Sequence, residues 1–184
     1  MCAARARHWH PYAGWELSIP FVPSMIVPYL SMFVLFVLPP FQLDEPELRA
    51  LTARLILASL LGGLVFLALP AEMGFVTHDD AGRWQGIYST LYRVDSPFNT
   101  IPSFHVIYTA SILLAMIEAA TPGLRRVYVA WLVVVCASTV LTHRHHLLDV
   151  VSGLALAFAT PALLRRPARS GLLLASAPSG RLQE

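Results

Sequence analysis

The sequence predicts an all-α fold, a polytopic bundle of five or six transmembrane helices with one short helix at the membrane interface. Its composition is the first reason: 56% of the 184 residues are hydrophobic and 13% are charged, which a soluble domain of this size rarely tolerates. Five apolar runs are the second, each close to the roughly 17–25 residues that a helix needs to cross a bilayer. Helix-ending proline or glycine between runs is the third. The runs cover residues 17–38, 50–69, 103–120, 124–141 and 147–164.

The first run is the least regular of the five. Pro20, Pro23 and Pro28 fall inside it, and a proline inside a helix removes a hydrogen bond and kinks the axis. We therefore expect this span to begin irregularly or to be kinked. Residues 1–16 form an N-terminal segment without the small-residue cleavage pattern of a signal peptide, so we expect the first span to be retained.

The placement of arginines predicts the orientation in the membrane, because short cytoplasmic loops are enriched in Lys and Arg. Arg125 and Arg126 mark the turn between the third and fourth runs as cytoplasmic, and Arg49 agrees for the loop between the first two runs. The remaining loops, residues 70–102 and 142–146, are then expected to face outward on one side.

Within the loop 70–102, aromatic and apolar residues recur at the spacing of one helical face. We expect a short helix there, with Asp79 or Asp80 capping its start. Trp and Tyr prefer the headgroup level, which favours a helix lying in the interface. Packing of this face against the bundle is an equally open alternative. The residues of this face are Trp84, Ile87, Tyr88, Leu91 and Tyr92.

Residues 17–166 are expected to form one membrane domain, followed by a disordered cytoplasmic tail at 167–184 that is rich in Ser, Pro, Arg and Ala. The net charge of +2 is too small to indicate a nucleic-acid partner. The two cysteines form neither a disulfide framework nor a zinc site. The adjacent His78, Asp79 and Asp80 rarely make a metal site on a loop, so we expect no metal and no cofactor.

The first group of residues suited to chemistry lies at the start of the third run. Pro102 and Ser103 suit a helix start, and backbone N–H groups at a helix N-terminus bind phosphate oxygens. Ser103 can add its own N–H and hydroxyl. His105, in the first turn, would then stand beside the anion as a proton donor.

The second group lies at the entrance of the fifth run. His145 and Asp149 are four residues apart, so a helix places them on one face, and an Asp that holds one ring nitrogen leaves the other free to attack phosphorus. A carboxylate in an apolar span costs about 2.5–3.5 kcal/mol on insertion scales, so Asp149 needs such a partner. Arg144 is a candidate phosphate ligand, whereas His143 and His146 fit a solvated loop equally well.

These residues resemble the motifs of the type 2 phosphatidic acid phosphatase superfamily. Its Pro-Ser-x-His motif matches residues 102–105, and its His-x-x-x-Asp motif matches residues 145–149. The residues around these motifs are most similar to those of the branch of inositol phosphorylceramide synthases and their bacterial relatives. The resemblance implies a bundle, usually of six spans, and metal-independent chemistry through phosphohistidine. His145 would be the nucleophile, Asp149 its orienting partner and His105 the general acid.

Two departures from this family concern phosphate binding. The family's first motif, a Lys and an Arg-Pro pair, has no clear counterpart, and Thr139 stands where an arginine is expected six residues before the nucleophile. We therefore expect Arg144 and Arg93 to supply the positive charge, with Ser103 and Asn99 adding hydrogen bonds.

The leading hypothesis is hydrolysis of a lipid phosphate ester. Transfer of a phospho-headgroup between lipids is the alternative that the branch resemblance favours, and a non-catalytic scaffold or lipid carrier is a third. A membrane haem protein is disfavoured, because axial histidines need matched depths in facing spans. We expect an integral membrane protein of the bacterial inner membrane, with its site facing the periplasm or exterior.

Overall fold

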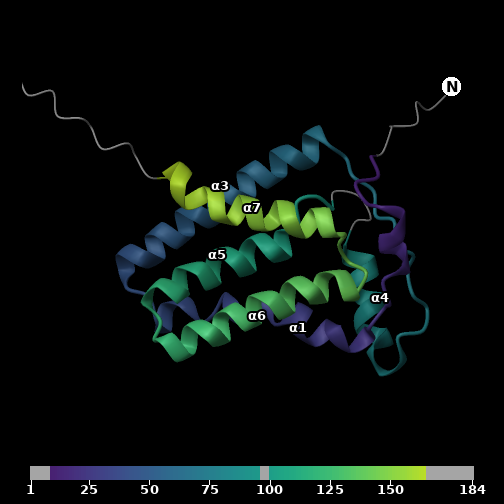
Figure 1. Cartoon of the computed structure of the whole chain (residues 1–184), viewed down its shortest axis with the longest axis horizontal. Helices are drawn as coiled ribbons and strands as arrows, with labels where there is room; N and C mark the ends of the chain where they lie inside the picture. The colour runs from purple at the N-terminus through teal and green to yellow at the C-terminus, as the bar shows by residue number, and fades with distance from the viewer. Residues whose placement is uncertain (1–8, 96–99, 165–184) are drawn as a thin grey trace, which may run out of the picture.

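A computed structural model describes residues 9–95 and 100–164, and every regular element in this part of the chain is a helix (Figure 1). The predicted all-α class is thereby confirmed for these residues. The 3-10 helices are η1 (Gly14–Ser18), η2 (Pro23–Met25), η3 (Pro39–Phe41) and η4 (Gly82–Trp84). The α-helices are α1 (Ile26–Leu30), α2 (Met32–Leu35), α3 (Glu45–Ala68), α4 (Gln85–Val94), α5 (Phe104–Ala119), α6 (Pro122–Leu141) and α7 (Leu147–Leu164). The predicted tail at 167–184 and residues 1–8 lie outside the described part.

Helix α5 lies at the centre of the bundle. It contacts α3 and α7 on one side and α6 on the other, and α2 also packs against it (Figure 1). Ile112, Leu113 and Met116 of α5 are buried in one cluster with Leu35 of α2 and Leu51 of α3. Close packing of this kind holds helices together in lipid, where burial of apolar surface gains little.

Three of the described helices, α3, α6 and α7, are long and apolar enough to cross a membrane. Helix α5 has 16 residues and spans about 24 Å at 1.5 Å per residue, less than the roughly 30 Å of a hydrocarbon core. The apolar stretch Pro23–Leu35 is shorter still. Length and composition thus indicate membrane integration through three helices, and a total of five or six spans stays a prediction.

The outer face of α3 is apolar and open. Ile56, Leu60, Leu64 and Leu67 are between 57% and 85% exposed. A contiguous apolar surface of this kind is unusual on a soluble monomer, and it is the surface expected of a helix that contacts lipid.

The first apolar run is broken into short helices, as its prolines predict. Pro23 opens η2, and Ser31 separates α1 from α2 while its hydroxyl donates to the carbonyl of Pro28 at 2.6 Å. The second run also departs from its expected bounds, because α3 begins before residue 50. Asp44 accepts from the Glu47 N–H at 2.9 Å, and the Glu47 carboxylate accepts from the Asp44 N–H at 2.8 Å. This capping box fixes the helix start in a polar stretch that hydropathy does not detect.

The short helix expected in the loop 70–102 is α4. Its buried Tyr88 packs with Ile26 and Tyr29, so the aromatic face covers the bundle, as the second interpretation holds. Asp80 stabilises the preceding turn by accepting from the Gly82 N–H at 3.0 Å, and Gly82 has a positive φ of 56°. Whether α4 also lies at a membrane interface stays a prediction.

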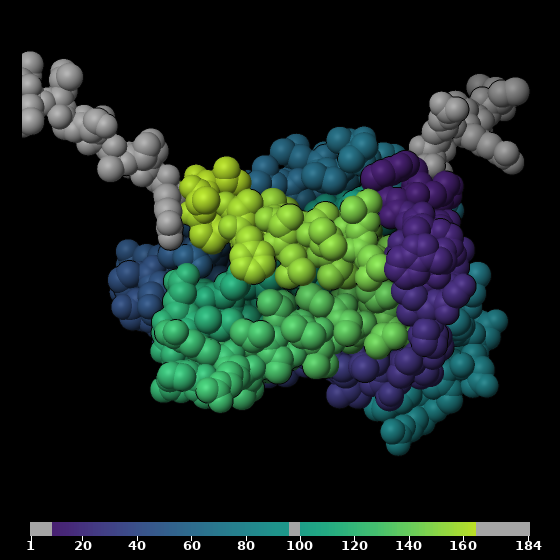
Figure 2. Space-filling model, in the orientation of Figure 1, coloured from purple at the N-terminus to yellow at the C-terminus, as the bar shows by residue number. Residues whose placement is uncertain are grey.

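The two loops predicted to share one side meet at one end of the bundle, on the right of Figure 1. Residues 9–22 cover the same end, where α6 finishes and α7 begins (Figure 2). Val22 donates its N–H to the carbonyl of Leu141 at 2.8 Å, and Trp9 donates to that of Pro70 at 3.1 Å. Segments far apart in sequence thus enclose this end.

Candidate active site

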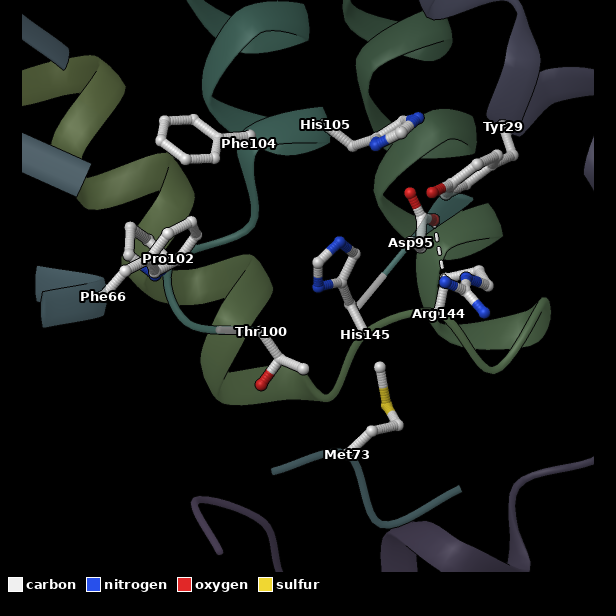
Figure 3. A pocket seen from close by; sticks show the side chains of 10 residues that line it. All are labelled: Tyr29, Phe66, Met73, Asp95, Thr100, Pro102, Phe104, His105, Arg144 and His145. Atoms are coloured by element: carbon white, nitrogen blue, oxygen red, sulfur yellow. Dashed lines mark hydrogen bonds and ion pairs between the residues drawn. The ribbon is translucent and has the colours of Figure 1, made fainter. Parts of the chain in front are cut away.

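A cavity of about 300 Å³ opens at this end, where α5 and α7 begin (Figure 3). His105 enters it from the first turn of α5, and Arg144 and His145 enter it from the loop before α7. The cavity therefore combines two imidazoles, a guanidinium and a carboxylate with apolar walls. Its lining residues are Tyr29, Phe66, Met73, Asp95, Thr100, Pro102, Phe104, His105, Arg144 and His145.

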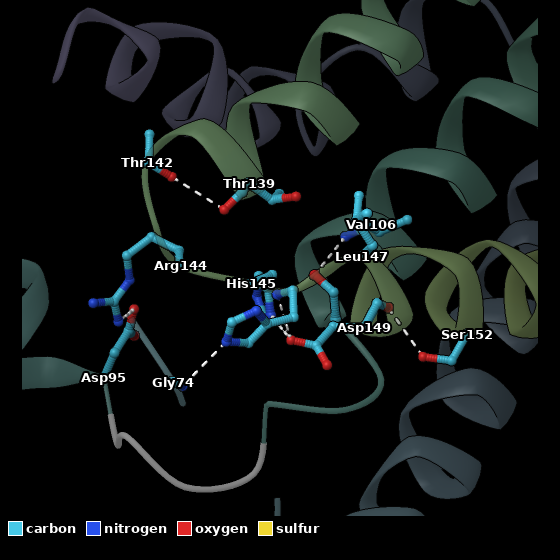
Figure 4. A network of polar contacts seen from close by, with 12 residues as sticks. Gly74, Asp95, Val106, Thr139, Thr142, Arg144, His145, Leu147, Asp149 and Ser152 are labelled. Atoms are coloured by element: carbon cyan, nitrogen blue, oxygen red, sulfur yellow. Dashed lines mark hydrogen bonds and ion pairs between the residues drawn. The ribbon is translucent and has the colours of Figure 1, made fainter. Parts of the chain in front are cut away.

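His145 and Asp149 are in contact, as their spacing predicts (Figure 4). Nδ1 of His145 lies 3.3 Å from Oδ2 of Asp149, whose side chain is fully buried. The same oxygen accepts from the His146 N–H at 2.9 Å. A carboxylate beside Nδ1 favours the proton on that nitrogen and leaves the Nε2 lone pair available. This arrangement suits a nucleophilic imidazole, although the role itself stays a prediction.

His105 faces His145 across the cavity, with their ring centroids 6.4 Å apart. Tyr29 of α1 stacks on His105 at a centroid distance of 3.9 Å and holds its ring in place. Nε2 of His105 is buried and has no hydrogen-bond partner among the described residues. A substrate oxygen entering the cavity could satisfy this nitrogen, and the role of His105 as general acid stays a prediction.

Arg144 is paired with Asp95, a residue that the sequence did not single out. Its guanidinium donates to Oδ2 of Asp95 at 2.7 Å and lies 5.2 Å from the ring centre of Tyr92. Asp95 directly follows α4 and belongs to no motif, so only the folded chain brings it to the cavity. Arg144 is thus placed to bind a phosphate in the cavity, but it already forms an ion pair with the carboxylate of Asp95.

The other predicted binding residues lie elsewhere. Ser103 is fully buried, where its hydroxyl accepts from the Val106 N–H at 3.4 Å and its N–H donates to the carbonyl of Asp149 at 3.0 Å. It caps α5 and ties it to α7, and it does not line the cavity. Arg93 is exposed in the last turn of α4, also away from the lining. Asn99 lies outside the described residues.

Gly153 allows α7 to approach the start of α5. A Cβ on this residue would lie 2.9 Å from the carbonyl oxygen of Ser103 and 3.1 Å from Cβ of Val106. Because the first contact is with backbone, a larger side chain could not be accommodated by a rotamer change alone. The close approach brings the start of α5, which carries His105, against α7 one turn after Asp149.

Glu16 supports the start of α7 from the N-terminal segment. Its buried carboxylate accepts from the N–H of Leu147 at 2.9 Å and from that of Ala13 at 2.8 Å. Its Oε2 also lies 3.4 Å from Nδ1 of His146, whose Nε2 accepts from the Gly74 N–H at 3.0 Å. Burial lowers the pKa of His146, and the nearby carboxylates of Asp149 and Glu16 oppose that shift. No motif in the sequence pointed to Glu16.

The solvated-loop interpretation of His143 and His146 is wrong, because both side chains are buried. Nε2 of His143 donates to the carbonyl of Ile19 at 2.9 Å, so its Nδ1 accepts from Nε2 of His78 at 2.8 Å. Phe75 stacks on both buried imidazoles, with centroid distances of 4.0 and 4.3 Å. Burial lowers the pKa of His143 and of His78. These rings stiffen the loop that carries His145.

Comparison with protein-family models matches residues 22–163 to a family described as the PAP2 superfamily. The matched region includes both histidine groups and almost all of the described helices. No curated protein and no solved structure gives a significant match.

Proposed function

This chain belongs to the PAP2 superfamily, and from that premise we propose that it is a membrane lipid phosphatase that works through phosphohistidine. Members of the superfamily act as metal-independent phosphoesterases or phosphotransferases. The observation that carries the proposal is the facing pair of histidines, with Asp149 behind His145 and His105 across the cavity. The active site would lie at the extracytoplasmic end of the bundle.

The reaction needs two displacements at phosphorus. Nε2 of His145 attacks and forms a P–N bond while the ester P–O bond breaks, and His105 gives its proton to the leaving alkoxide. Water then attacks the phosphohistidine, His105 takes a proton from it, and the P–N bond breaks to release inorganic phosphate. Arg144 would balance the charge on the phosphoryl oxygens.

Apolar features next to the cavity support a substrate with a hydrocarbon chain. Phe66 contacts Phe104 edge to face at 5.0 Å, and Phe104 stacks on Tyr108 at 5.5 Å, one turn further along α5. These rings follow the seam between α3 and α5 toward an apolar groove. The groove is lined by Phe36, Leu55, Ile56, Ser59, Leu60 and Tyr108.

The test replaces His145 with Gln in the full chain and measures phosphate release from phosphatidate in detergent. We expect a loss of about 10³-fold or more in kcat, together with loss of a radiolabelled phosphoenzyme, since the nucleophile is absent. His10, exposed at the same end of the bundle, is the control, and His10→Gln should keep full activity. Full activity of H145Q would contradict the assignment of His145 as nucleophile. If the protein is a scaffold or lipid carrier, the wild type itself will show neither turnover nor a phosphoenzyme.

The Arg144–Asp95 pair favours a second candidate, transfer of a phospho-headgroup between lipids. A carboxylate in the cavity suits a phosphodiester, with one negative charge, better than a monoester that carries nearly two. A radiolabelled phospholipid incubated with and without an alcohol acceptor separates the two activities. Label released into water, as free phosphate from a monoester or as the phosphorylated headgroup from a diester, indicates hydrolysis, whereas label attached to the added alcohol acceptor indicates transfer.

A further inference from the structure

The ion pair between Arg144 and Asp95 occupies the position where a substrate phosphate would bind. Among the described residues that line the cavity, Arg144 carries the one permanent positive charge, and Asp95 holds it at 2.7 Å. We propose that Asp95 is a specificity-determining residue whose carboxylate competes with phosphate for Arg144 and weakens the binding of both substrate and released inorganic phosphate. This inference rests on the proposed function only in assigning phosphate binding to Arg144.

The two partners differ in their freedom to move. The Arg144 side chain is 11% exposed and is held over the Tyr92 ring, whereas the Asp95 side chain is 38% exposed. The Asp95 backbone is fixed, because its N–H donates to the carbonyl of Leu91 at 2.8 Å. Asp95 can therefore turn its carboxylate away by side-chain rotation while Arg144 stays in the cavity.

A second cavity of about 160 Å³ lies beside the first and gives the displaced carboxylate a place to go. Met73, Asp95 and Arg144 line both spaces, so the ion pair stands between them. The second cavity is also lined by Phe75, Val76, Thr77, Tyr92 and His143.

Competition follows from the chemistry of the three groups. Carboxylate and phosphate oxygens both bind the planar fork of a guanidinium, and the geometry of that fork favours one such bidentate partner at a time. Asp95 accepts from Nη2 of Arg144, so a phosphate that binds both prongs of the fork through Nη2 must displace it, and the displaced carboxylate repels the phosphate as a like charge. When Asp95 pairs again with Arg144, it promotes release of the inorganic phosphate that hydrolysis leaves behind.

The experiment compares Asp95→Asn with the wild type for binding of inorganic phosphate to the full chain in detergent, by calorimetric titration. Asn keeps the shape of the side chain and removes its charge. We expect roughly ten-fold tighter phosphate binding, on the order of the effect of one like charge removed from a partly screened site. In the enzyme assay, the KM and the inhibition constant of phosphate should fall in parallel.

Asp79, exposed in the same outer loop, is the matched control, because Asp79→Asn changes the net charge equally and should leave phosphate binding within two-fold. Adding Arg144→Gln to D95N should abolish the gain. Asp95→Ser provides a second charge-removing variant if D95N unfolds.

Phosphate binding that is unchanged or weaker in D95N and D95S would overturn the proposal, because Asp95 would then only position Arg144. Phosphate binding that is undetectable in both wild type and D95N would overturn it as well. Tighter binding by D95N in a protein without turnover would refute the proposed function and still support competition at Arg144, since the titration needs no catalysis.

Discussion

At the scale of single residues, three histidines within four positions have different surroundings. Nε2 of His143 is committed to the carbonyl of Ile19, and Nε2 of His146 is committed to the N–H of Gly74. His145 alone of the three lines the cavity that also holds His105, and its Nδ1 is the nitrogen held by Asp149. Hydrogen bonding therefore distinguishes the candidate nucleophile from its neighbours, which serve as structural groups.

The imidazoles of His143, which is buried, and His78, which is half-buried, predict that the protein loses stability in acid. Burial lowers the pKa of His143 and His78 in the folded state, so the unfolded chain binds more protons below about pH 6.5. Stability is then fully present above that pH and falls as the pH drops toward the folded-state pKa. Protonation of His143 would also add a proton to its Nδ1, which would then face the N–H at Nε2 of His78.

Thermal unfolding in detergent at pH 7.5 and pH 5 measures this effect. We expect a lower Tm at pH 5 for the wild type and a smaller decrease for His143→Gln, which has no titrating group at this position. An equal decrease in the two proteins would show that other groups cause the acid sensitivity.

At the scale of elements, the first turn of α7 is held from two directions. Ser103 at the start of α5 donates to the carbonyl of Asp149, and Gly153 packs against the Ser103 carbonyl one turn further on. From the N-terminal segment, Glu16 accepts from the N–H of Leu147. The site depends on these contacts, because they set the distance between α5, which carries His105, and the start of α7, which directly follows the loop with His145.

Gly153→Ala should move α7 away from α5. The added Cβ would meet the Ser103 carbonyl at 2.9 Å, and overpacking of this kind typically costs about 1–3 kcal/mol. We expect a lower Tm and a kcat reduced by roughly ten-fold or more, since a small misplacement of catalytic groups slows the reaction. Gly63→Ala is the control, because a Cβ there meets nothing within 4 Å and helix propensity favours Ala. Equal Tm and kcat for G153A and G63A would contradict the inference that the close packing of α7 on α5 positions the site.

Glu16→Gln should weaken the start of α7. Removing the charge from a buried group that accepts two backbone N–H bonds is expected to lower the free energy of unfolding by about 1–2 kcal/mol. Denaturant unfolding of E16Q and of the wild type in detergent measures this difference in free energy. Glu118→Gln, at an exposed position in α5, is the control and should leave the free energy of unfolding unchanged. If E16Q is as stable as the wild type, Glu16 does not stabilise the start of α7.

At the scale of the whole molecule, packed aromatic rings of α3 and α5 lie between the cavity and an apolar groove. Phe66 and Phe104 line the cavity, and Tyr108, on which Phe104 stacks, lines the groove. A lipid could place its phosphate between the histidines and its chain along the helices. This division of the molecule suits a substrate that is polar at one end only.

Filling the groove should impair long-chain substrates selectively. Leu60→Trp places a bulky ring where the hydrocarbon chain would lie, and we expect KM for a long-chain phosphatidate to rise about five-fold or more, the effect of losing about one buried methylene group. Turnover of the chainless p-nitrophenyl phosphate should not change. Val133→Trp on the exposed face of α6 is the control, and equal effects on both substrates would argue against a chain-binding groove.

Local sequence was enough to predict several features of this protein. Composition and apolar runs indicate a helical membrane fold, the prolines indicate a broken first run, and the four-residue spacing places Asp149 beside His145. Each of these features depends on neighbours within one or two helical turns. The sequence therefore predicts them without knowledge of the remaining chain.

Only the tertiary structure decided how the cavity is completed. It brings Asp95 to Arg144 and Glu16 to Leu147, and it buries Ser103 as a link between α5 and α7. These contacts join segments far apart in the chain, and they depend on which helix faces pack together. A single carboxylate in a loop has no spacing that reveals its partner, so charge balance at the proposed phosphate site becomes visible only when the helices are assembled.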